Sequence, residues 1–316
     1  MVSIVILNWN GYSDTAECLH SLQTLNNKDY QVWVVDNASS NNEAARLKDE
    51  FPWTNIIPLT ENKGFCGGCN EGMQRALKAG ADYIMLLNND TLVTPSLLED
   101  LLKGYKKLDK PGAVSPLIMH HPETDKIWFS EAIWKWNWRK GQVGFALTNG
   151  KLLDTLKDHP PYKSMFACGC CLLVSSAVVK EIGLFDERYF AFFDEAEWCA
   201  RMKKKGYDSF IIPSAKMYHK VGGTIPSLLM TYLMTRNGAL WVKENLPFAK
   251  KCITWIVFWK NLVWHYMNAK GWIPEKKRYQ NSKYSKVVLK GFSDYRQNRF
   301  GKWSADLELI INDKKK

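Results

Sequence analysis

The 316-residue sequence predicts an α/β fold, in which a mostly parallel sheet is flanked by helices and followed by a helical, basic C-terminal extension. Three observations predict it. Apolar runs alternate with helix-like segments four times in the first hundred residues, which is typical of crossovers in a parallel, Rossmann-like sheet. Polar clusters follow three of these runs. Basic residues gather near the C-terminus: residues 251–316 hold 15 Lys and Arg against 5 Asp and Glu, and residues 1–250 hold 28 against 27.

Each expected strand is a short, continuous apolar run, as in strands that are buried on both faces. The expected strands are 2–7, 31–35, 55–59, 83–87, 112–116, 166–174 and 210–213. Each expected helix carries apolar residues at intervals of three and four. The expected helices are 13–25, 42–50, a segment ending near 79, 96–109, a segment beginning near 194, and 227–243.

The strand at 83–87 is followed by Asn88, Asn89 and Asp90. In a parallel sheet, ligands bind beyond the carboxyl ends of the strands, so we expect Asp90 at the mouth of a cleft. A carboxylate beside amide oxygens suits a hard cation, such as Mg²⁺ or Mn²⁺, that bridges phosphates. The competing interpretation is an ordinary turn, because Asn and Asp are also common turn residues.

Two other polar segments end at the same edge, and a glycine-rich loop opens a helix beside them. These segments are 8–11, 36–40 and 61–70. Backbone amides and a cation are what the phosphates of a nucleotide require, so this edge is a candidate nucleotide site. The glycine-rich segment is neither Gly-x-Gly-x-x-Gly after a strand nor a Walker loop, which excludes those two classes of site.

Asp194, Glu195 and Glu197 follow an aromatic segment that begins at Phe185. A carboxyl group behind an apolar wall has a raised proton affinity, which a general base needs. Acidic residues in the first turn of a helix are also ordinary partners of its dipole.

Two other features leave a choice between binding and packing. Trp134, Trp136 and Trp138 alternate as on one face of a strand, and they could stack on a sugar or simply pack. His219 follows the strand at 210–213, and a single histidine can be a metal ligand, a phosphate contact or a structural residue.

Taken together, these motifs resemble the family-2 glycosyltransferases of the A-type nucleotide-diphospho-sugar transferase fold, in particular their rhamnosyltransferase-like branch. The resemblance runs from Ile4 to about Gly238, with a weaker similarity at 291–301. It rests on seven motifs in the same order and at similar spacing. These are Ile6 to Asn10, Val35 to Ser39, Asn62 to Phe65, Leu87 to Thr91, Phe185 to Phe190, Asp194 to Glu197, and Tyr232 with Arg236 and Asn237.

The resemblance implies an inverting transfer of a sugar from a dTDP- or UDP-linked donor to a hydroxyl of a glycan or lipid-linked acceptor. It implies Mg²⁺ or Mn²⁺ on the diphosphate, held by Asp90 with Asn88 and His219. The catalytic base falls on Glu195, with Asp194 beside it.

Contacts with the nucleotide are expected from Asn8, Asn10, Asp36, Asn37, Asn62, Lys63, Gly64 and Asn89. Contacts with the acceptor are expected from Trp136, Gly169, Glu197 and Trp198.

The sequence departs from the family pattern in three places. Asn88 replaces the first Asp of the metal motif, which removes one carboxylate. The usual Glu-Asp order is reversed in Asp194-Glu195, so the base reaches one methylene further or Asp194 takes that role. Cysteines 66 and 69 flank two glycines, and with the cysteines at 168–171 they could form a Cys₄ zinc site, although small buried thiols are the commoner case.

Residues 252–267 are rich in aromatic side chains but are interrupted by Lys260, and basic residues follow at 276–278. This pattern favours a helix that lies in a membrane interface. The alternative is a helix packed on the catalytic domain, followed by a solvated basic tail. No apolar run reaches the about 20 residues of a spanning helix, and the N-terminus lacks a basic leader.

We therefore expect a cytoplasmic enzyme, peripheral on the inner face of the cell membrane, that builds a surface polysaccharide or glycolipid. No nucleic acid partner is expected, because the basic residues show no recognised reader fold. The expected domains are a catalytic domain at 1–240, divided into a nucleotide half (1–95) and an acceptor half (96–240), and a membrane-associating segment at 241–316.

Two alternative functions remain. A nucleotidyltransferase of similar fold would carry a basic, glycine-rich loop after its first strand, which residues 8–11 do not supply. A catalytically decayed nucleotide- or glycan-binding protein is the other, for which the loss of an acid at Asn88 leaves room.

Overall fold

The structure is a computed structural model that describes residues 1–137, 142–148, 153–220, 226–274 and 282–313, with the backbone alone at 135–137 and 142–148. The chain divides into two compact units. The first contains Met1–Ile133, Ala146–Asp186 and Asp194–Gly222, and the second contains Trp134–Phe145, Glu187–Phe193 and Gly223–Lys316. The boundaries of these units differ from those of the expected domains at 1–240 and 241–316. The expected domains describe a division of function, and that division remains a prediction.

Within the described residues, the first unit is built on one ten-stranded sheet of order β10-β12-β6-β11-β4-β1-β2-β3, with β5 paired to β12 and β7 to β6. Its strands are β1 (Val2–Asn8), β2 (Tyr30–Asp36), β3 (Asn55–Pro58), β4 (Tyr83–Asn88), β5 (Thr91–Val93), β6 (Pro111–His121), β7 (Ile127–Phe129), β10 (Tyr162–Ser164), β11 (Cys171–Ser175) and β12 (Asp208–Lys220). Its helices are α1 (Tyr12–Leu22), α2 (Glu43–Glu50), α3 (Gly64–Lys78), α4 (Leu97–Lys106), α5 (Ser176–Ile182) and α6 (Asp194–Lys204).

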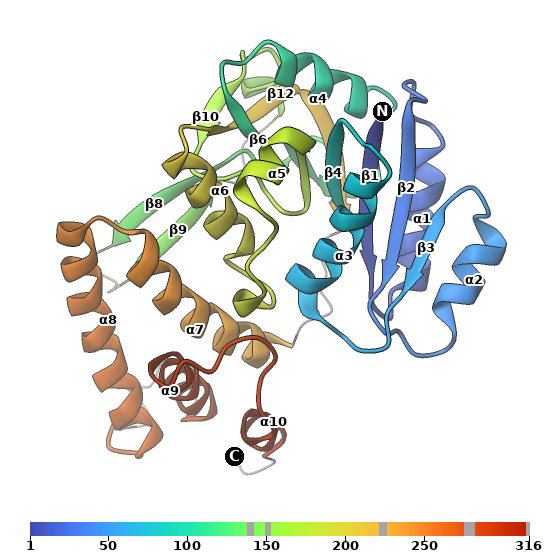
Figure 1. Cartoon of the computed structure of the whole chain (residues 1–316). Helices are drawn as coiled ribbons and strands as arrows, with labels where there is room; N and C mark the ends of the chain where they lie inside the picture. The colour runs from blue at the N-terminus through green and yellow to red at the C-terminus, as the bar shows by residue number, and fades with distance from the viewer. Residues whose placement is uncertain (138–141, 149–152, 221–225, 275–281, 314–316) are drawn as a thin grey trace. The chain divides into compact units, whose positions relative to one another are not determined.

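The strands β4, β1, β2 and β3 are all parallel and lie side by side, with α3 in front of them and α1 behind (Figure 1). The next strand, β11, runs antiparallel to both β4 and β6. The sheet is therefore mixed. The carboxyl ends of its four parallel strands, β4, β1, β2 and β3, form the edge that was predicted to bind the nucleotide. This arrangement of sheet and flanking helices confirms the predicted fold class.

The predicted glycine-rich loop is wrong in one respect, because Gly64 already begins α3 and the glycines lie inside the helix. A Cβ built on Gly68 would stand 2.3 Å from Leu7 Cδ1, and one built on Gly72 would stand 2.3 Å from Val5 Cγ1. The glycines thus let the helix approach β1 closely. Their role is packing rather than a flexible loop.

The second unit is mainly helical in its described part. Its helices are α7 (Ser227–Asn245), α8 (Phe248–Ala269), α9 (Ser282–Arg296) and α10 (Ala305–Asn312). A Cβ on Gly291 of α9 would stand 2.8 Å from the Tyr232 carbonyl oxygen of α7, so these two helices pack closely there. The Tyr232 hydroxyl also donates to the buried Asp294 carboxylate over 2.8 Å. The strands β8 (Glu131–Asn137) and β9 (Gln142–Thr148) pair with each other.

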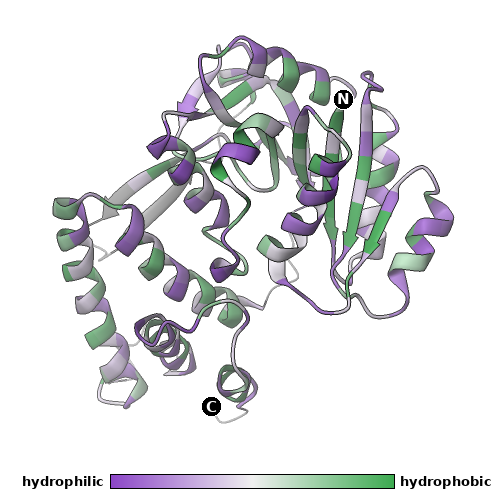
Figure 2. Cartoon of the chain, in the orientation of Figure 1, coloured by the Kyte–Doolittle hydropathy of each residue, from purple (hydrophilic) through white to green (hydrophobic). Residues whose placement is uncertain are grey.

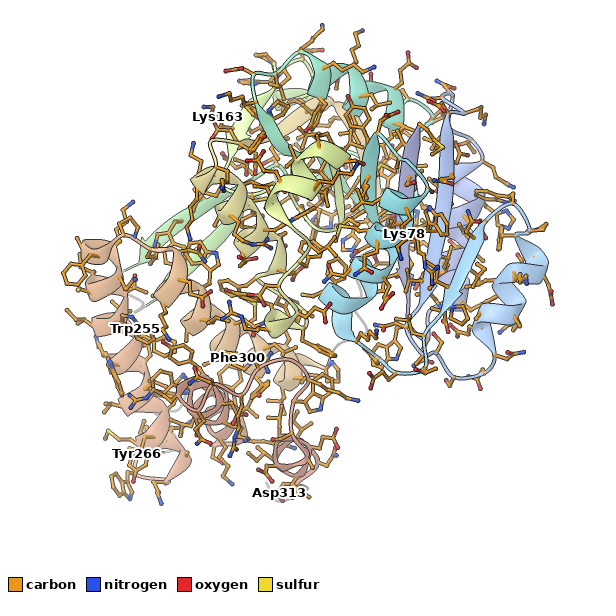
Figure 3. The ribbon with its side chains drawn as sticks, in the orientation of Figure 1. Lys78, Lys163, Trp255, Tyr266, Phe300 and Asp313 are labelled. Atoms are coloured by element: carbon orange, nitrogen blue, oxygen red, sulfur yellow. The ribbon has the colours of Figure 1, made fainter. Side chains whose placement is uncertain are left out.

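Helix α8 presents large apolar side chains to solvent at intervals of three, four or eight residues. We call these the exposed α8 stripe: Phe248, Ile256, Trp259, Val263, Tyr266 and Met267. In Figure 2, α8 carries hydrophobic and hydrophilic segments in alternation, and Figure 3 labels Trp255 and Tyr266 on it. Trp255 instead packs against Phe292 and Tyr295 of α9. None of the described helices qualifies as a candidate membrane span.

Candidate active site

The carboxyl ends of β1, β2 and β4 are joined by a chain of hydrogen bonds. Asn8 Nδ2 donates to Asp36 Oδ1 over 2.7 Å, and Thr15 Oγ1 donates to Asn8 Oδ1 over 2.7 Å. Asn89 Nδ2 in turn donates to Thr15 Oγ1 over 2.9 Å. We call Asp36, Asn8, Thr15 and Asn89 the edge network. The structure therefore brings together three of the predicted nucleotide residues, but Asn8 is fully buried and acts within the network.

Three residues of this edge were missed from sequence: Thr15, which belongs to the edge network, and also Glu43 and Ser39. The Glu43 carboxylate is 6% exposed and accepts hydrogen bonds from Asn8 Nδ2 and from the Gly11 backbone N–H, over 3.0 and 3.1 Å. Ser39 Oγ accepts from the Asn10 backbone N–H over 2.9 Å. Glu43 begins α2, and only tertiary structure carries its side chain to the end of β1. The available signal was an acidic residue in the first turn of the expected helix at 42–50.

Asn37 joins the end of β2 to the start of α3. Its Nδ2 donates to Asn62 Oδ1 and to the Gly64 carbonyl, both over 3.1 Å. Its Oδ1 accepts from the Lys63 backbone N–H over 2.9 Å. The Lys63 ammonium pairs with Glu71 over 2.7 Å. These four predicted nucleotide residues are thus adjacent, and Asn37 fixes how α3 begins.

Asn10 adopts a left-handed backbone conformation (φ 51°) on the exposed rim of the same edge. Its Oδ1 accepts from both the backbone N–H and the hydroxyl of Ser40, each over 2.8 Å. Asn tolerates this conformation better than most residues, because its short polar side chain can bond locally. The rim is therefore shaped before any ligand binds.

Asp90 pairs with His219, which β12 brings beside the end of β4. Asp90 Oδ2 lies 3.2 Å from His219 Nε2, and both side chains are largely buried. Asp90 Oδ1 and His219 Nδ1 are buried and have no hydrogen-bond partner within the part of the chain that the structure describes. The ring of Trp128 packs on the imidazole with centroids 4.5 Å apart. Buried polar atoms without partners are costly, and an ion or an ordered water bound at this pair would supply the partners.

A divalent cation fits this pair. Carboxylate oxygen suits Mg²⁺ and Mn²⁺, and imidazole nitrogen is also an acceptable ligand for Mn²⁺. No group of three or more His, Cys, Asp or Glu side chains that could hold a metal occurs among the described residues. The chain thus supplies a partial site, and the phosphate oxygens of a bound nucleotide would have to complete the coordination.

Glu195 lies at the second position of α6, beside the backbone of Gly169. A Cβ on Gly169 would stand 3.8 Å from Glu195 Oε1, which is ordinary van der Waals contact. Burial raises the pKa of the Glu195 carboxyl, and hydrogen bonds from backbone groups, including that of Gly169, and from Asp194 oppose the shift. Glu195 is partly exposed and Asp194 is buried. Of the two acids, Glu195 is the one with access to a substrate.

The other predicted acceptor residues do not face a substrate where the structure describes them. Trp198 has no exposed surface and donates from Nε1 to the Gly183 carbonyl over 2.8 Å. Glu197 is 5% exposed and pairs with Arg201 over 2.7 Å. Both side chains brace α6, because the helix turns them inward, and we do not carry them forward as acceptor contacts. Trp136 lies outside the residues with described side chains.

The packing interpretation fits the neighbouring Trp134, whose ring stacks on Trp241 with centroids 5.1 Å apart. Trp138 lies outside the described residues.

The cysteines form no metal site in the part of the chain that the structure describes. Seven of the eight are buried, and Cys252 is exposed. Burial raises the pKa of the thiols of Cys66, Cys69, Cys168 and Cys170, as expected of small thiols packed in a core. The zinc hypothesis is therefore wrong, and the small thiols pack in the core.

Comparison with known proteins identifies relatives of this chain. The profile of Glycosyl transferase family 2 matches residues 3–183. The dTDP-rhamnosyl transferase RfbF of Shigella flexneri is 24% identical over 245 residues, which cover 74% of this chain and 78% of that protein. The N-acetylglucosaminyl-diphospho-decaprenol L-rhamnosyltransferase of Mycobacterium tuberculosis is 24% identical over 225 residues, which cover 64% of this chain and 70% of that protein.

Solved structures share the fold. GalNAc-T7, crystallised with UDP, GalNAc and Mn²⁺, superposes with a TM-score of 0.58 at 15% identity, and the match covers 99% of this chain and 56% of that one. Residues 1–349 of S. aureus TarS superpose with a TM-score of 0.53 at 14% identity, covering 93% of this chain and 80% of that one. At such identities the likeness concerns the fold alone.

Proposed function

We propose that this chain, which belongs to Glycosyl transferase family 2, transfers a deoxyhexose or hexose with inversion to a glycan or lipid-linked acceptor. Membership of the family and its rhamnosyltransferase relatives make it a glycosyltransferase of glycan synthesis. The observation that carries the finer proposal is the Asp90–His219 pair, in which Asp90 Oδ1 and His219 Nδ1 are buried and have no hydrogen-bond partner among the described residues. Four points are proposals: the inversion of the anomeric centre, the identity of the donor, the identity of the acceptor, and the binding to a membrane surface.

The proposed donor is a dTDP- or UDP-linked sugar. A dTDP-rhamnosyl transferase is among the relatives, and a solved structure of the same fold was crystallised with UDP. Asn10 on the exposed rim, with Asp36 and Asn37, which are 4% and 2% exposed, would face the base and ribose. The buried Asn8 and the half-buried Asn89 would hold Asp36 in place through the edge network.

The diphosphate would lie near the start of α3 and near Asp90. The first backbone N–H groups of a helix and its dipole favour an anion, and Lys63 stands at the N-cap of α3. Asp90 and His219, with the Asn88 amide, would hold Mg²⁺ or Mn²⁺. Such an ion, when bound, offsets the negative charge that develops on the departing nucleoside diphosphate.

Glu195 would remove the proton from the acceptor hydroxyl. As the O–H bond breaks, the hydroxyl oxygen forms its bond to the anomeric carbon, and the bond to the diphosphate oxygen breaks on the opposite face. This single displacement inverts the anomeric centre. Burial moves the pKa of Glu195 upward, toward neutral pH. A general base is most effective when its pKa lies near the pH at which the enzyme works.

The C-terminal helices would bind a membrane surface on the cytoplasmic side, where a lipid-linked acceptor is found. The exposed α8 stripe is accompanied by the exposed Lys250, Lys260 and Lys270. Apolar side chains flanked by lysines are typical of helices that lie in the headgroup region of anionic bilayers.

Calorimetric titration with UDP, dTDP and GDP, each with and without Mn²⁺, tests the donor and the ion. We expect one nucleotide to bind tightly, and only when both Mn²⁺ and Asp90 are present, so Asp90→Ala should remove the effect of the metal. If the folded protein bound none of the nucleotides, the proposal would be wrong. Binding without turnover of any sugar donor would instead indicate a nucleotide-binding protein with a decayed site.

Vesicle sedimentation tests the membrane surface. Replacing Ile256 and Val263 by Asp should weaken binding to anionic vesicles at least about tenfold, since each apolar side chain contributes about 1.5–3 kcal/mol on burial. Leu309→Asp is the matched control, because Leu309 is an exposed apolar residue on α10 outside the stripe. Equal losses from both substitutions would remove the assignment of the stripe as the membrane face.

A further inference from the structure

We propose that Asn237 of α7 is a positioning residue for the catalytic base. Its side-chain amide holds the segment 187–193 in the conformation that leads into Asp194 and Glu195. This inference rests on the proposed function, because it assumes that Glu195 is the base. The segment 187–193 and α7 both belong to the second unit, and a peptide bond joins Phe193 to Asp194.

The segment 187–193 has an unusual backbone. Phe190, Phe192 and Phe193 have φ angles of 63°, 67° and 67°. Residues with a Cβ rarely occupy this left-handed region, and bulky ones least of all. Such a conformation persists only where the surroundings hold it, and it is often found at functional sites. Something must therefore fix this segment.

The amide of Asn237 supplies that constraint. Its Nδ2 lies 2.7 Å from the Tyr189 carbonyl oxygen, 2.8 Å from that of Ala191 and 3.0 Å from that of Phe192. The side chain has no exposed surface, so water does not compete for these contacts. One amide group thus binds three carbonyls of the left-handed segment.

Arg236 fixes which way this amide points. Its Nε donates to Asn237 Oδ1 over 3.1 Å, and its NH1 donates to the Gly301 carbonyl over 2.7 Å. With Oδ1 committed to the arginine, Nδ2 must face the segment. Arg236 is also fully buried. The hydrogen bond from Arg236 therefore orients the amide so that its N–H groups donate to the segment.

The same helix limits the last residue of the segment. A Cβ on Gly238 would stand 3.2 Å from Phe193 Cζ, which is tighter than most real contacts. The glycine leaves room for the Phe193 ring against α7. Asn237 and Gly238 together define where the backbone leaves the segment, and α6 begins with the next residue, Asp194.

Asn237→Asp in the full-length protein tests the inference. The substitution keeps the side-chain shape but removes both N–H donors. We expect kcat for sugar transfer to fall about 10- to 100-fold, as misplacement of a reacting group by about 1 Å does. The donor KM and the calorimetric affinity for the nucleotide should stay unchanged, because Asn237 does not touch the edge network.

Hydrogen exchange gives a readout that is independent of activity. Amides of residues 187–195 should exchange faster in Asn237→Asp, whereas those of α9 should not. Ser285→Ala is the matched control, because Ser285 is buried in the same unit and its hydroxyl bonds His265 and Asn268 rather than residues of the segment. It should lower stability and leave kcat and the exchange of 187–195 unchanged.

Gly238→Ala provides a second variant, should Asn237→Asp fail to fold. Alanine favours the helix, but its Cβ presses on Phe193, so kcat should fall several-fold without loss of the fold. Unchanged kcat and exchange in a folded Asn237→Asp or Gly238→Ala protein would overturn the inference. If wild type transfers no sugar, or Glu195→Gln is fully active, the proposed function has failed instead.

Discussion

The sharpest test of the active site is to replace Glu195 by Gln and Asp194 by Asn, one at a time. Gln keeps the size of Glu195 and one acceptor oxygen but cannot take up a proton. Loss of a general base costs about 10²- to 10⁴-fold in kcat, which corresponds to about 3–5 kcal/mol of transition-state stabilisation. Asp194 is buried and hydrogen-bonds Glu195, so Asp194→Asn should act only through the pKa of the base and should lower kcat less than Glu195→Gln does.

The pH dependence adds a second readout. Because burial raises the pKa of Glu195, activity should rise with pH through a value above the ordinary 4.5, and Glu195→Gln should lack this limb. Because the pKa of Glu195 is higher in the folded state, this residue contributes to the stability of the fold below pH 4.5. That contribution is lost as the pH rises through the folded-state pKa. The Gln variant should therefore be at least as stable as wild type at neutral pH.

The assay is single-turnover transfer from the donor sugar that calorimetry identifies, measured from pH 5 to 9, with the nucleotide affinity of each variant as the control. Affinity should be equal in all three proteins. A larger loss in Asp194→Asn than in Glu195→Gln would assign the base to Asp194. Losses below tenfold in both variants would refute the assignment of the base to this pair.

Three further predictions concern other parts of the chain. Asp90→Asn should lower kcat at least about 10²-fold in the presence of Mn²⁺, since a metal on the leaving group is worth several kcal/mol, and excess Mn²⁺ should not restore it. Gly72→Ala should lower the free energy of unfolding by about 1–2 kcal/mol in denaturant titration, although alanine favours helices, because its Cβ overlaps the methyl of Val5. Adding Val5→Ala should show favourable coupling with Gly72→Ala, and strict additivity would contradict the packing argument. Burial lowers the pKa of His265 from 6.5 to about 4. The contribution of this residue to the free energy of unfolding is therefore present above pH 6.5 and is lost as the pH falls toward 4. Thermal denaturation should show a loss of about 2 kcal/mol between pH 7 and pH 5 that is absent in His265→Gln.

The strands of the nucleotide half were predictable because each is a continuous apolar run. β1, β2, β3 and β4 lie within one or two residues of their expected bounds. The meeting of Asn8, Asp36 and Asn89 also followed from sequence, since parallel strands end at one edge. Local pattern was sufficient for these four strands, including β3, which is only partly buried.

Features that depend on distant partners were not predictable. Gly68 lies inside a helix, and glycine is required there because Leu7 leaves no room for a larger residue. Glu43 and Thr15 reach the edge network from helices whose packing the sequence does not display. Trp198 points inward because of which face α6 turns toward the core. The run of acidic and aromatic residues around it does not show from sequence which face that is.

The second unit is assembled from three separate parts of the chain, the last of which starts at Gly223. During synthesis on a ribosome, the segment 187–193 therefore emerges well before the amide of Asn237 that holds it. A nascent chain, or one truncated after the first 222 residues, would carry every residue of the proposed nucleotide and metal site but would lack the partners of this segment. We therefore expect that the C-terminal helices cannot be removed or exchanged as an independent module, and that catalytic competence appears only after the chain is nearly complete.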